Sequence, residues 1–233
     1  MKKKVLLTLA AAMAVTSVSF ASPLSNYDKG SLAIDLNMSI SPKLESGDSI
    51  DAKSRLGAGI TYGIGDKFAV QYNYLDNKSK NAPFEEYDGA DYEIGTQNAQ
   101  VTGQHFNLLY QINPNISAFA GWTKAKLKVN STFEYGDGSG PLGNGSDSYK
   151  ESQNGYQVGF IGQTKLADNL TGWTLISAGN KINAYEIGVG YDLAKNTEFN
   201  VFYRQTKYKD FGDSDDKFDV KTKGLGAGLT FKF

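Results

Sequence analysis

Cysteine is absent from the 233 residues of this sequence, so no disulfide bond holds the fold together. A basic excess is absent too, because 24 Lys and Arg stand against 25 Asp and Glu, and nucleic-acid binding normally needs a basic surface. Beyond the first 21 residues, no stretch stays apolar for the roughly 20 residues of a membrane-spanning helix. The sequence therefore predicts no nucleic-acid partner and no helical membrane span.

The first residues have the pattern of a secretory signal peptide. Three lysines are followed by an apolar stretch from Val5 to Val15, which is too short to span a bilayer as a helix. Small residues at Ser19 and Ala21 fit the cleavage rule and predict a cut after Ala21. We therefore expect residues 1–21 to be removed on export and residues 22–233 to form one domain.

A period of two dominates what the sequence does contain. It has 14 Tyr, 13 Phe and 26 Gly, and every second residue from Leu32 to Ile40 is apolar. This alternation is typical of a strand with one apolar face and not of a helix. The stretch also has the length of a tilted membrane strand, which is about 9–11 residues.

Tight turns join further strands of this kind into hairpins. Turns centred on Asp66 and Pro114 place the apolar residues of both flanking strands on one face. The expected partners are Ile64–Phe68, Tyr62–Val70, Ile60–Tyr72, Ile112–Ile116, Tyr110–Ala118, Leu108–Ala120 and Phe106–Trp122. A turn near Asp168 leads into a strand whose apolar face carries Trp173 and Leu175, and a fourth turn centres on Lys195. With the final strand, we count ten.

The connections between these strands mostly alternate in length, and the short link from Gly179 to Asn183 is the exception. The long ones are polar and cover residues 42–53, 76–100, 129–152 and 209–219. Outer-membrane barrels have short periplasmic turns and long external loops, whereas a soluble sandwich has no reason to sort its loops in this way. We therefore predict an all-β fold, a transmembrane antiparallel up-and-down β-barrel of about ten strands, with eight strands as the alternative.

The end of the chain adds a resemblance to a known family. Residues 224–233 alternate apolar side chains and finish on Phe231 and Phe233. Together with the signal peptide and the strands, this ending resembles the small outer-membrane β-barrel proteins of Gram-negative bacteria, the porin-like or OmpA-type superfamily. The resemblance implies an outer-membrane location, and it implies that Phe231 and Phe233 form the signal read by the barrel assembly machinery. The eight-stranded members of this superfamily are shorter than the present chain.

Polar side chains alternate with the apolar ones and would face the lumen of a barrel. A hairpin centred on Lys195 sets Glu186 opposite Arg204 as an ion pair, either as part of a filled interior or as a selectivity element of a pore. Asp35 and Lys232 invite the same interpretation, because their strands meet at closure. The lumen-facing candidates are Asp35, Asn37, Gln71, His105, Asn107, Gln157, Glu186, Arg204 and Lys232.

His105 is the only histidine, and a histidine near the rim of a barrel suggests a general base. A base needs hydrogen-bonding partners, and no serine, carboxylate or protease motif can be placed beside it from the sequence. We therefore interpret it as a polar lumen residue and predict no enzymatic activity.

Two long segments are acidic. Residues 76–100 contain six Asp and Glu, and residues 209–219 contain five. Neither segment has the spacing of a calcium loop, so we predict no metal site and no cofactor, and we interpret both as a solvated rim that attracts cations. Bridging to lipopolysaccharide through divalent ions is a hypothesis.

These patterns favour a small porin-like channel for ions or small polar solutes. The alternative is a sealed structural barrel or an adhesin, which would bind a host or other surface ligand through residues 76–100 and 129–152. An outer-membrane enzyme comes third. The expected partners are outer-membrane lipid and lipopolysaccharide.

Overall fold

The computed structural model describes residues 23–40, 43–46, 48–53, 55–212 and 217–233. The expected signal peptide lies outside these residues. Within them, no helix is long and apolar enough to cross a membrane. The described residues form thirteen strands of one antiparallel sheet. The strands are β1 (Leu32–Ser39), β2 (Lys43–Ser46), β3 (Asp48–Lys53), β4 (Leu56–Gly65), β5 (Phe68–Ser79), β6 (Ala82–Asp88), β7 (Asp91–Asn113), β8 (Ile116–Asp137), β9 (Gly140–Ala167), β10 (Leu170–Gly179), β11 (Ile182–Ala194), β12 (Thr197–Phe211) and β13 (Phe218–Lys232).

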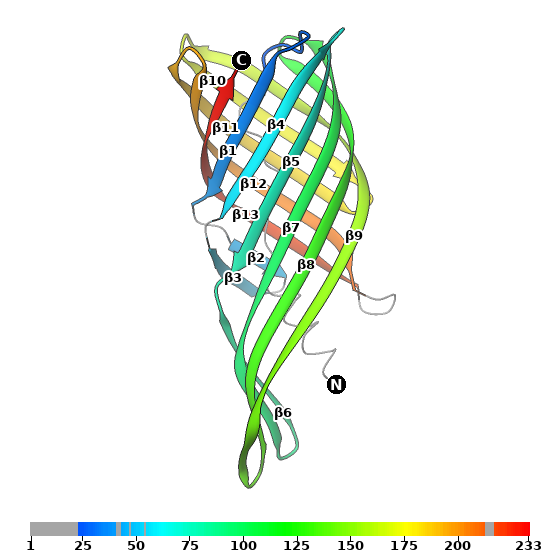
Figure 1. Ribbon diagram of the computed structural model, residues 1–233, viewed down its shortest axis with the longest axis vertical. Coiled ribbons are helices and arrows are strands. Elements are labelled where there is room, and N and C mark those ends of the chain that lie inside the picture. Colours follow the sequence, from blue (N-terminus) through cyan, green and yellow to red (C-terminus); the bar gives the residue numbers. More distant parts are fainter. Residues whose placement is uncertain (1–22, 41–42, 47, 54, 213–216) are drawn as a thin grey trace.

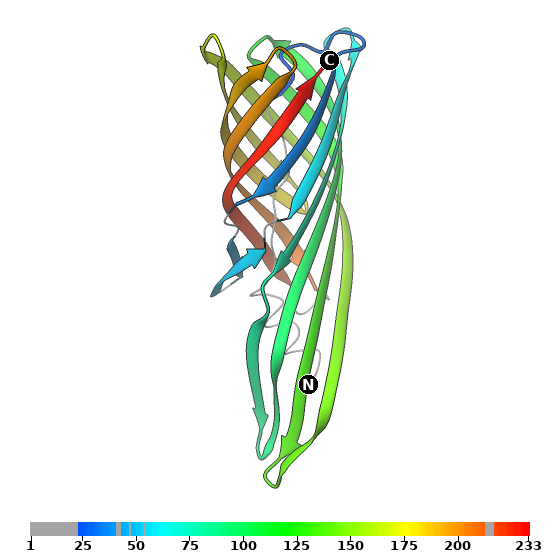
Figure 2. The same cartoon turned by 60° about the vertical axis from the view of Figure 1, so that its left-hand side comes forward.

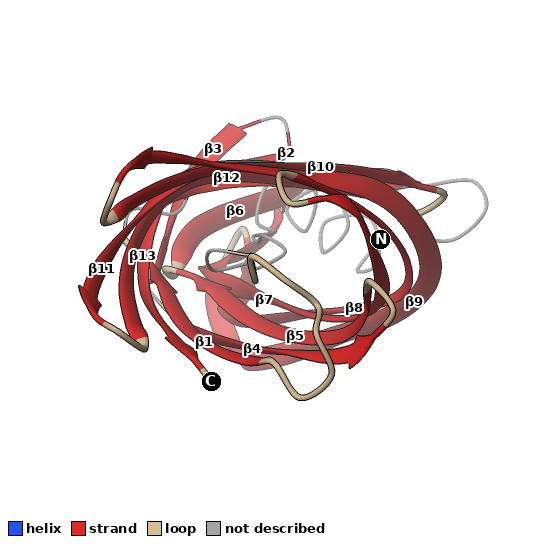
Figure 3. Ribbon diagram, turned by 90° about the horizontal axis from the view of Figure 1, so that it is seen from above, coloured by secondary structure: helices blue, strands red, loops and turns tan. Residues whose placement is uncertain are grey.

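Ten of these strands close a ring (Figures 1 and 3). Strands β1, β4, β5, β7, β8, β9, β10, β11, β12 and β13 pair in that order, and β13 pairs back with β1. Closure places Leu36 opposite Leu229 and Ile34 opposite Phe231. A closed ring pairs every ladder group, which a sheet in lipid must do because unpaired backbone groups there cost several kcal/mol each. The predicted ten-stranded barrel is confirmed.

The C-terminus lies at the same end of the ring as the four tight turns (Figure 1). The first described residues lie there too, because Gln163 and Gln111, close to two of these turns, donate hydrogen bonds to the carbonyls of Leu24 and Ser25. These turns follow β4, β7, β9 and β11. Outer-membrane barrels keep their short turns on the periplasmic side. The opposite end, toward which the longest strands run, is therefore external.

The predicted hairpin registers hold except beside the turns. Five of the seven expected pairs occur, namely Tyr62–Val70, Ile60–Tyr72, Tyr110–Ala118, Leu108–Ala120 and Phe106–Trp122. The pairs Ile64–Phe68 and Ile112–Ile116 are wrong, because Phe68 pairs with Gly65 and Ile116 with Asn113. A one-residue shift next to each turn causes the difference. At the first turn, Asp66 and Lys67 adopt left-handed φ angles of 52° and 70°, which close the hairpin in two residues.

Outward-facing side chains form an apolar band around the ring. In β4, exposed and buried residues alternate along the whole strand, and Ile60 and Ile64 are among the exposed ones. On β5, β7, β8 and β9 the band ends toward the exterior in four paired aromatic residues, here called the outer aromatic row: Tyr72, Phe106, Trp122 and Tyr156. Aromatic rows of this kind mark the boundary between lipid and water.

Beyond the outer aromatic row, β7, β8 and β9 continue out of the barrel and form one sheet with β6 (Figures 1 and 2). This projecting sheet consists of residues 82–104 and 124–154, with strand order β6-β7-β8-β9. The segments 76–100 and 129–152, which the sequence predicted as loops, are thus β-strands over most of their length. Continuous hydrogen bonding from the barrel explains this, because each strand extends a pairing that already exists below it.

Single cysteines can report this orientation, because the chain has none of its own. Asn144→Cys lies on the projecting sheet and Lys195→Cys in a short turn, and both residues are exposed. In intact Gram-negative cells, a membrane-impermeant maleimide should label the first variant at once, and the second only after the outer membrane is permeabilised. Labelling of Lys195→Cys in intact cells would contradict the assignment of the two ends.

Candidate functional site

A row of amide side chains crosses the inner wall of the barrel. Gln71 on β5 donates to the Thr61 hydroxyl of β4 at 3.0 Å and accepts from Asn107 on β7, also at 3.0 Å. Gln157 on β9 donates to Asn107 at 3.0 Å. It reaches across β8 because the residue between them is Gly121, where a Cβ would lie 2.0 Å from the Asn107 amide oxygen. The structure therefore joins three of the expected lumen residues in one network.

A second cluster surrounds Glu186 on β11. Arg204 on β12 lies opposite it in the expected register, and the guanidinium pairs with the carboxylate. Trp173 on β10 donates its indole N–H to the same carboxylate at 2.8 Å. The three residues are between 1% and 3% exposed, so the charges are held away from bulk water. Such enclosure demands several partners for each charge, and here they come from three adjacent strands.

This cluster corrects one expectation about β10. Trp173 and Leu175 point inward and are buried, whereas Ile176 takes the lipid-facing position. The apolar character of Trp173 and Leu175 alone predicted that both face the lipid. The buried Glu186 carboxylate explains the choice, because the indole N–H would have no acceptor in lipid and finds one inside.

Lys232 pairs with a carboxylate outside the predicted set of lumen residues. Its Nζ lies 2.8 Å from a carboxylate oxygen of Glu198 on β12, whose side chain is buried. Asp35 lies inside the barrel opposite Thr230, and Asn37 lies opposite Gly228. The sequence pattern could have identified Glu198 as a lumen residue. It lies an even number of residues from the inward-facing Arg204 on the same strand, so both side chains point to the same face.

His105 lies on the inner face of β7, opposite Asn73 and Thr123. Its side chain is buried, and neither ring nitrogen has a hydrogen-bond partner among the described residues. In the same part of the chain, no three His, Cys, Asp or Glu side chains lie close enough together to hold a metal ion. The described surroundings therefore offer the ring no acid that would orient it as a base.

The described N-terminal segment, residues 23–31, contacts the periplasmic end of the barrel. Gln163 on β9 and Gln111 on β7 donate side-chain hydrogen bonds to the carbonyls of Leu24 and Ser25, at 3.1 and 2.8 Å. Farther along the segment, the Tyr27 carbonyl accepts from β4 at 3.1 Å. The segment is thus held by three strands, β9, β7 and β4. A depression of about 360 Å³, lined mostly by residues of β9 to β13, remains beside it.

The far end of the projecting sheet carries a pocket of about 320 Å³. Its lining combines carboxylates with aromatic and apolar side chains, and the residues are Glu86, Asp88, Asp91, Tyr92, Glu93, Tyr135, Gly136 and Leu142. Leu142 is 63% exposed and Tyr135 is 42% exposed. Nearby Tyr87 is 62% exposed. Apolar side chains gathered on a surface that faces water indicate an interaction site. We call this region the tip pocket.

Negative charge is concentrated around the tip pocket. Residues 81–98 and 129–149 contain eight Asp and Glu and no Lys, Arg or His. Glu86 lies directly opposite Glu93, so like charges oppose each other across the β6–β7 hairpin. At the neighbouring turn, hydrogen bonds from Ser139 hold the pKa of the Asp137 carboxyl below its usual range.

The predicted acidic rim is therefore only partly present at the barrel mouth. Most acids of residues 76–100 lie at the tip, because the segment extends as strands. In the segment 209–219, Asp210 and Asp219 pair with Lys181 and Lys207 at 3.2 and 2.6 Å, which neutralises them. The remaining acids of that segment, at positions 213, 215 and 216, lie outside the described residues.

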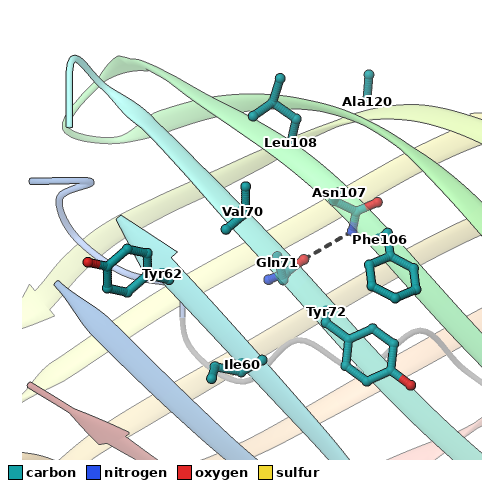
Figure 4. A pocket seen from close by; sticks show the side chains of 9 residues that line it. All are labelled: Ile60, Tyr62, Val70, Gln71, Tyr72, Phe106, Asn107, Leu108 and Ala120. Carbon is teal, nitrogen blue, oxygen red and sulfur yellow. Dashed lines mark hydrogen bonds between the residues drawn. The ribbon is translucent and has the colours of Figure 1, made fainter. Parts of the chain in front are cut away.

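A groove of about 550 Å³ lies on the lipid-facing surface of β4, β5, β7 and β8 (Figure 4). Apolar side chains border it, with Val70 and Leu108 on one side and Ile60, Tyr72 and Phe106 farther along. It exists because the outward residue of β8 at this level is Ala120, which is too small to fill the space between its neighbours. Its apolar border suits a hydrocarbon chain.

Comparison with known proteins identifies the class. The profile of the family described as outer membrane protein beta-barrel domain matches residues 8–233. Among solved structures, the outer membrane protease OmpT of Escherichia coli is 15% identical, with a TM-score of 0.58 over 91% of this chain and 99% of that one. The attachment invasion locus protein Ail of Yersinia pestis is 12% identical, with a TM-score of 0.41 over 87% and 99%. No curated relative was found.

The Glu186 cluster leads to a stability prediction. Arg204→Met removes the cation from an enclosed carboxylate, so we expect the free energy of unfolding to fall by roughly 3–5 kcal/mol. Adding Glu186→Gln removes the charge, keeps an acceptor for Trp173 and should restore part of the loss. Urea unfolding in lipid vesicles, followed by tryptophan fluorescence, measures the change. The control Ile187→Val, on the lipid face, should shift stability by less than about 1.5 kcal/mol. Unchanged unfolding of Arg204→Met would contradict the prediction.

Proposed function

This chain belongs to the outer membrane protein β-barrel domain family, and from that premise we propose that it is a surface recognition protein without catalytic activity. In this proposal the barrel anchors the projecting sheet, and the tip pocket binds a basic protein surface. The observation that carries it is the gathering of exposed Tyr135 and Leu142 with carboxylates at the farthest end of a sheet that stands outside the lipid.

The chemistry of the tip pocket suits a basic partner. Aromatic side chains supply contact area at low cost in conformational entropy, and they are enriched at the centres of protein interfaces. The surrounding carboxylates would steer a cationic surface toward the pocket and exclude acidic ones. The opposed pair Glu86 and Glu93 gains most from such a partner, because a cation between them relieves their repulsion.

A porin-like channel is the second candidate. Polar side chains on the inner wall, such as Asn107 and Gln157, favour it. Against it stand the N-terminal segment, which is bound at the periplasmic end by β9, β7 and β4, and the apolar residues that point inward there, including Leu109 and Phe119. A conducting pore of this family type has a polar, water-filled interior.

Binding to a basic probe tests the tip pocket. We expect the purified mature chain in detergent to bind lysozyme, a basic protein, more tightly than serum albumin, an acidic one. The quadruple variant Glu86→Gln/Asp88→Asn/Asp91→Asn/Glu93→Gln should weaken lysozyme binding by at least about tenfold, since it removes the attracting charges. Surface plasmon resonance at low ionic strength measures this.

The matched control neutralises four exposed acids at the periplasmic end, Asp28→Asn/Asp66→Asn/Asp168→Asn/Asp192→Asn. It changes net charge equally and should leave binding within about twofold. Tyr135→Ser/Leu142→Ser should weaken binding at high salt as well, since apolar contact is not screened. Equal losses in the tip variant and the control would mean that net charge alone attracts the probe, and the tip pocket would lose its role.

Conductance in a planar bilayer tests the second candidate. We expect the folded mature chain to give no discrete single-channel steps, because residues 23–31 are bound to both β7 and β9 at one mouth. Discrete, cation-favouring steps in a preparation that migrates as folded barrel on an unheated detergent gel would instead make a channel the function.

A further inference from the structure

Lysines gather on one outward face of the projecting sheet, just beyond the outer aromatic row. On β8, the outward positions after Trp122 are Lys124, Lys126 and Lys128. Register then places Lys150 of β9 directly opposite Lys128. On the other side, Gln100 of β7 lies between Lys128 and Lys78 of β5, and Lys78 faces Lys53 of β3. We call these six residues the lysine belt: Lys53, Lys78, Lys124, Lys126, Lys128 and Lys150.

The belt lies at the height of the polar layer of the outer leaflet. Lys124 follows Trp122 by two residues and Lys128 follows it by six. Six residues of strand span about 20 Å, which a tilt of about 40° reduces to about 15 Å of height. The belt therefore begins at the aromatic boundary and extends outward through the layer where lipid head groups and their sugars lie.

Nothing on this face of the described protein neutralises the belt. None of its lysines forms an ion pair with another described residue. Asp76 lies in the same cross-strand row as Lys126, but its carboxylate is paired with Arg55 at 3.2 Å and accepts from Gln100 at 2.6 Å. Lys128 and Lys150 oppose each other as like charges, which is unfavourable without an anion between them. A surface depression of about 400 Å³ lies at this point, and its lining contains Lys126, Lys128 and Lys150. Glu151 also lines it, but the carboxylate of Glu151 accepts hydrogen bonds from the backbone N–H of Gly212 and pairs with none of the three lysines.

The same strands hold a matching apolar surface below the aromatic row. Going outward along β8, the lipid-facing residues change from Ala120, which borders the apolar groove of Figure 4, to Trp122 and then to Lys124. This order matches that of the parts of a phosphorylated glycolipid. Ala120 leaves room for an acyl chain, Trp122 lies at the boundary beside the sugars, and Lys124 lies beyond it beside the phosphates.

We propose that this face binds a phosphorylated glycolipid of the outer leaflet, with acyl chains in the groove bordered by Ala120 and phosphates on the lysine belt. The partner is lipopolysaccharide by its chemistry, since it joins phosphates to sugars and several acyl chains at this depth. Contact with the belt ties the base of the projecting sheet to the lipid surface, and the acidic tip is repelled from that surface. The inference is independent of what the tip pocket binds.

Binding of purified lipopolysaccharide tests the proposal on the folded mature chain. The wild type should bind phosphorylated lipopolysaccharide, and enzymatic removal of its phosphates should weaken binding. The variant Lys124→Gln/Lys126→Gln/Lys128→Gln/Lys150→Gln should bind the phosphorylated form roughly 100- to 1000-fold less tightly, at about one factor of five per lysine. Microscale thermophoresis at low and high salt measures both effects, and an unheated gel checks that each variant is folded.

The matched control removes four exposed lysines at the periplasmic end, Lys29→Gln/Lys67→Gln/Lys165→Gln/Lys195→Gln, and should bind as the wild type does. A second test changes the groove: Ala120→Phe fills it and should weaken binding of lipopolysaccharide but not of free inorganic phosphate. The proposal is overturned if the belt variant binds like the wild type, if the control loses as much, or if dephosphorylation has no effect. It is also overturned if heparin binds the belt as tightly as lipopolysaccharide and Ala120→Phe changes neither, because the site would then recognise any polyanion.

Discussion

The closure of the ring between β1 and β13 is the constraint on which the rest of the structure depends. Lipid offers backbone groups no hydrogen-bonding partner, so the sheet must end on itself. Closure divides every strand into a lipid face and an inner face, with no alternative assignment for any residue between the turns and the aromatic row. It therefore decides that Glu186 and Arg204 meet inside, where each needs the other. It also decides that the groove beside Ala120 faces lipid.

The projecting sheet follows from the same ladder. Once β7, β8 and β9 are held in register by the barrel, extending them costs little additional order, and each added pair contributes its own backbone hydrogen bonds. The extension also separates the charged side chains by their distance from the membrane. Its base carries the lysine belt, its end carries the acids around Glu86 and Glu93, and a strand rise of about 3.3 Å per residue separates the two by tens of ångströms. The chain has almost no net charge, but its charges are separated along the barrel axis, with positive charge near the membrane and negative charge at the tip.

Period-two alternation and turn chemistry were sufficient to predict the ten strands of the ring and most hairpin registers, but not β2, β3, β6 or the projecting parts of β7, β8 and β9. Phe106 and Trp122, for example, pair as the sequence requires, because centring the hairpin on Pro114 fixes every later pair. The misplaced pairs lie beside turns, where one extra residue is absorbed and no hydrophobic pattern records it. Trp173 was misplaced for a different reason. Its direction depends on the Glu186 carboxylate thirteen residues away, and single-strand polarity contains no information about that partner.

The candidate sites also differ in how far the sequence alone could predict them. Inward parity identified Gln71, Asn107 and Gln157 separately, but their network depends on Gly121, whose role appears only when β8 is seen between them. The lysine belt is harder still to predict from the sequence. Its members Lys53, Lys78, Lys128 and Lys150 lie on four strands and are far apart in the chain. Read along the chain, Lys78 belongs to an acidic segment. Strand register places most of those acids at the tip and leaves Lys78 among other lysines. The surface next to the membrane therefore has the opposite charge from the segment that contains Lys78.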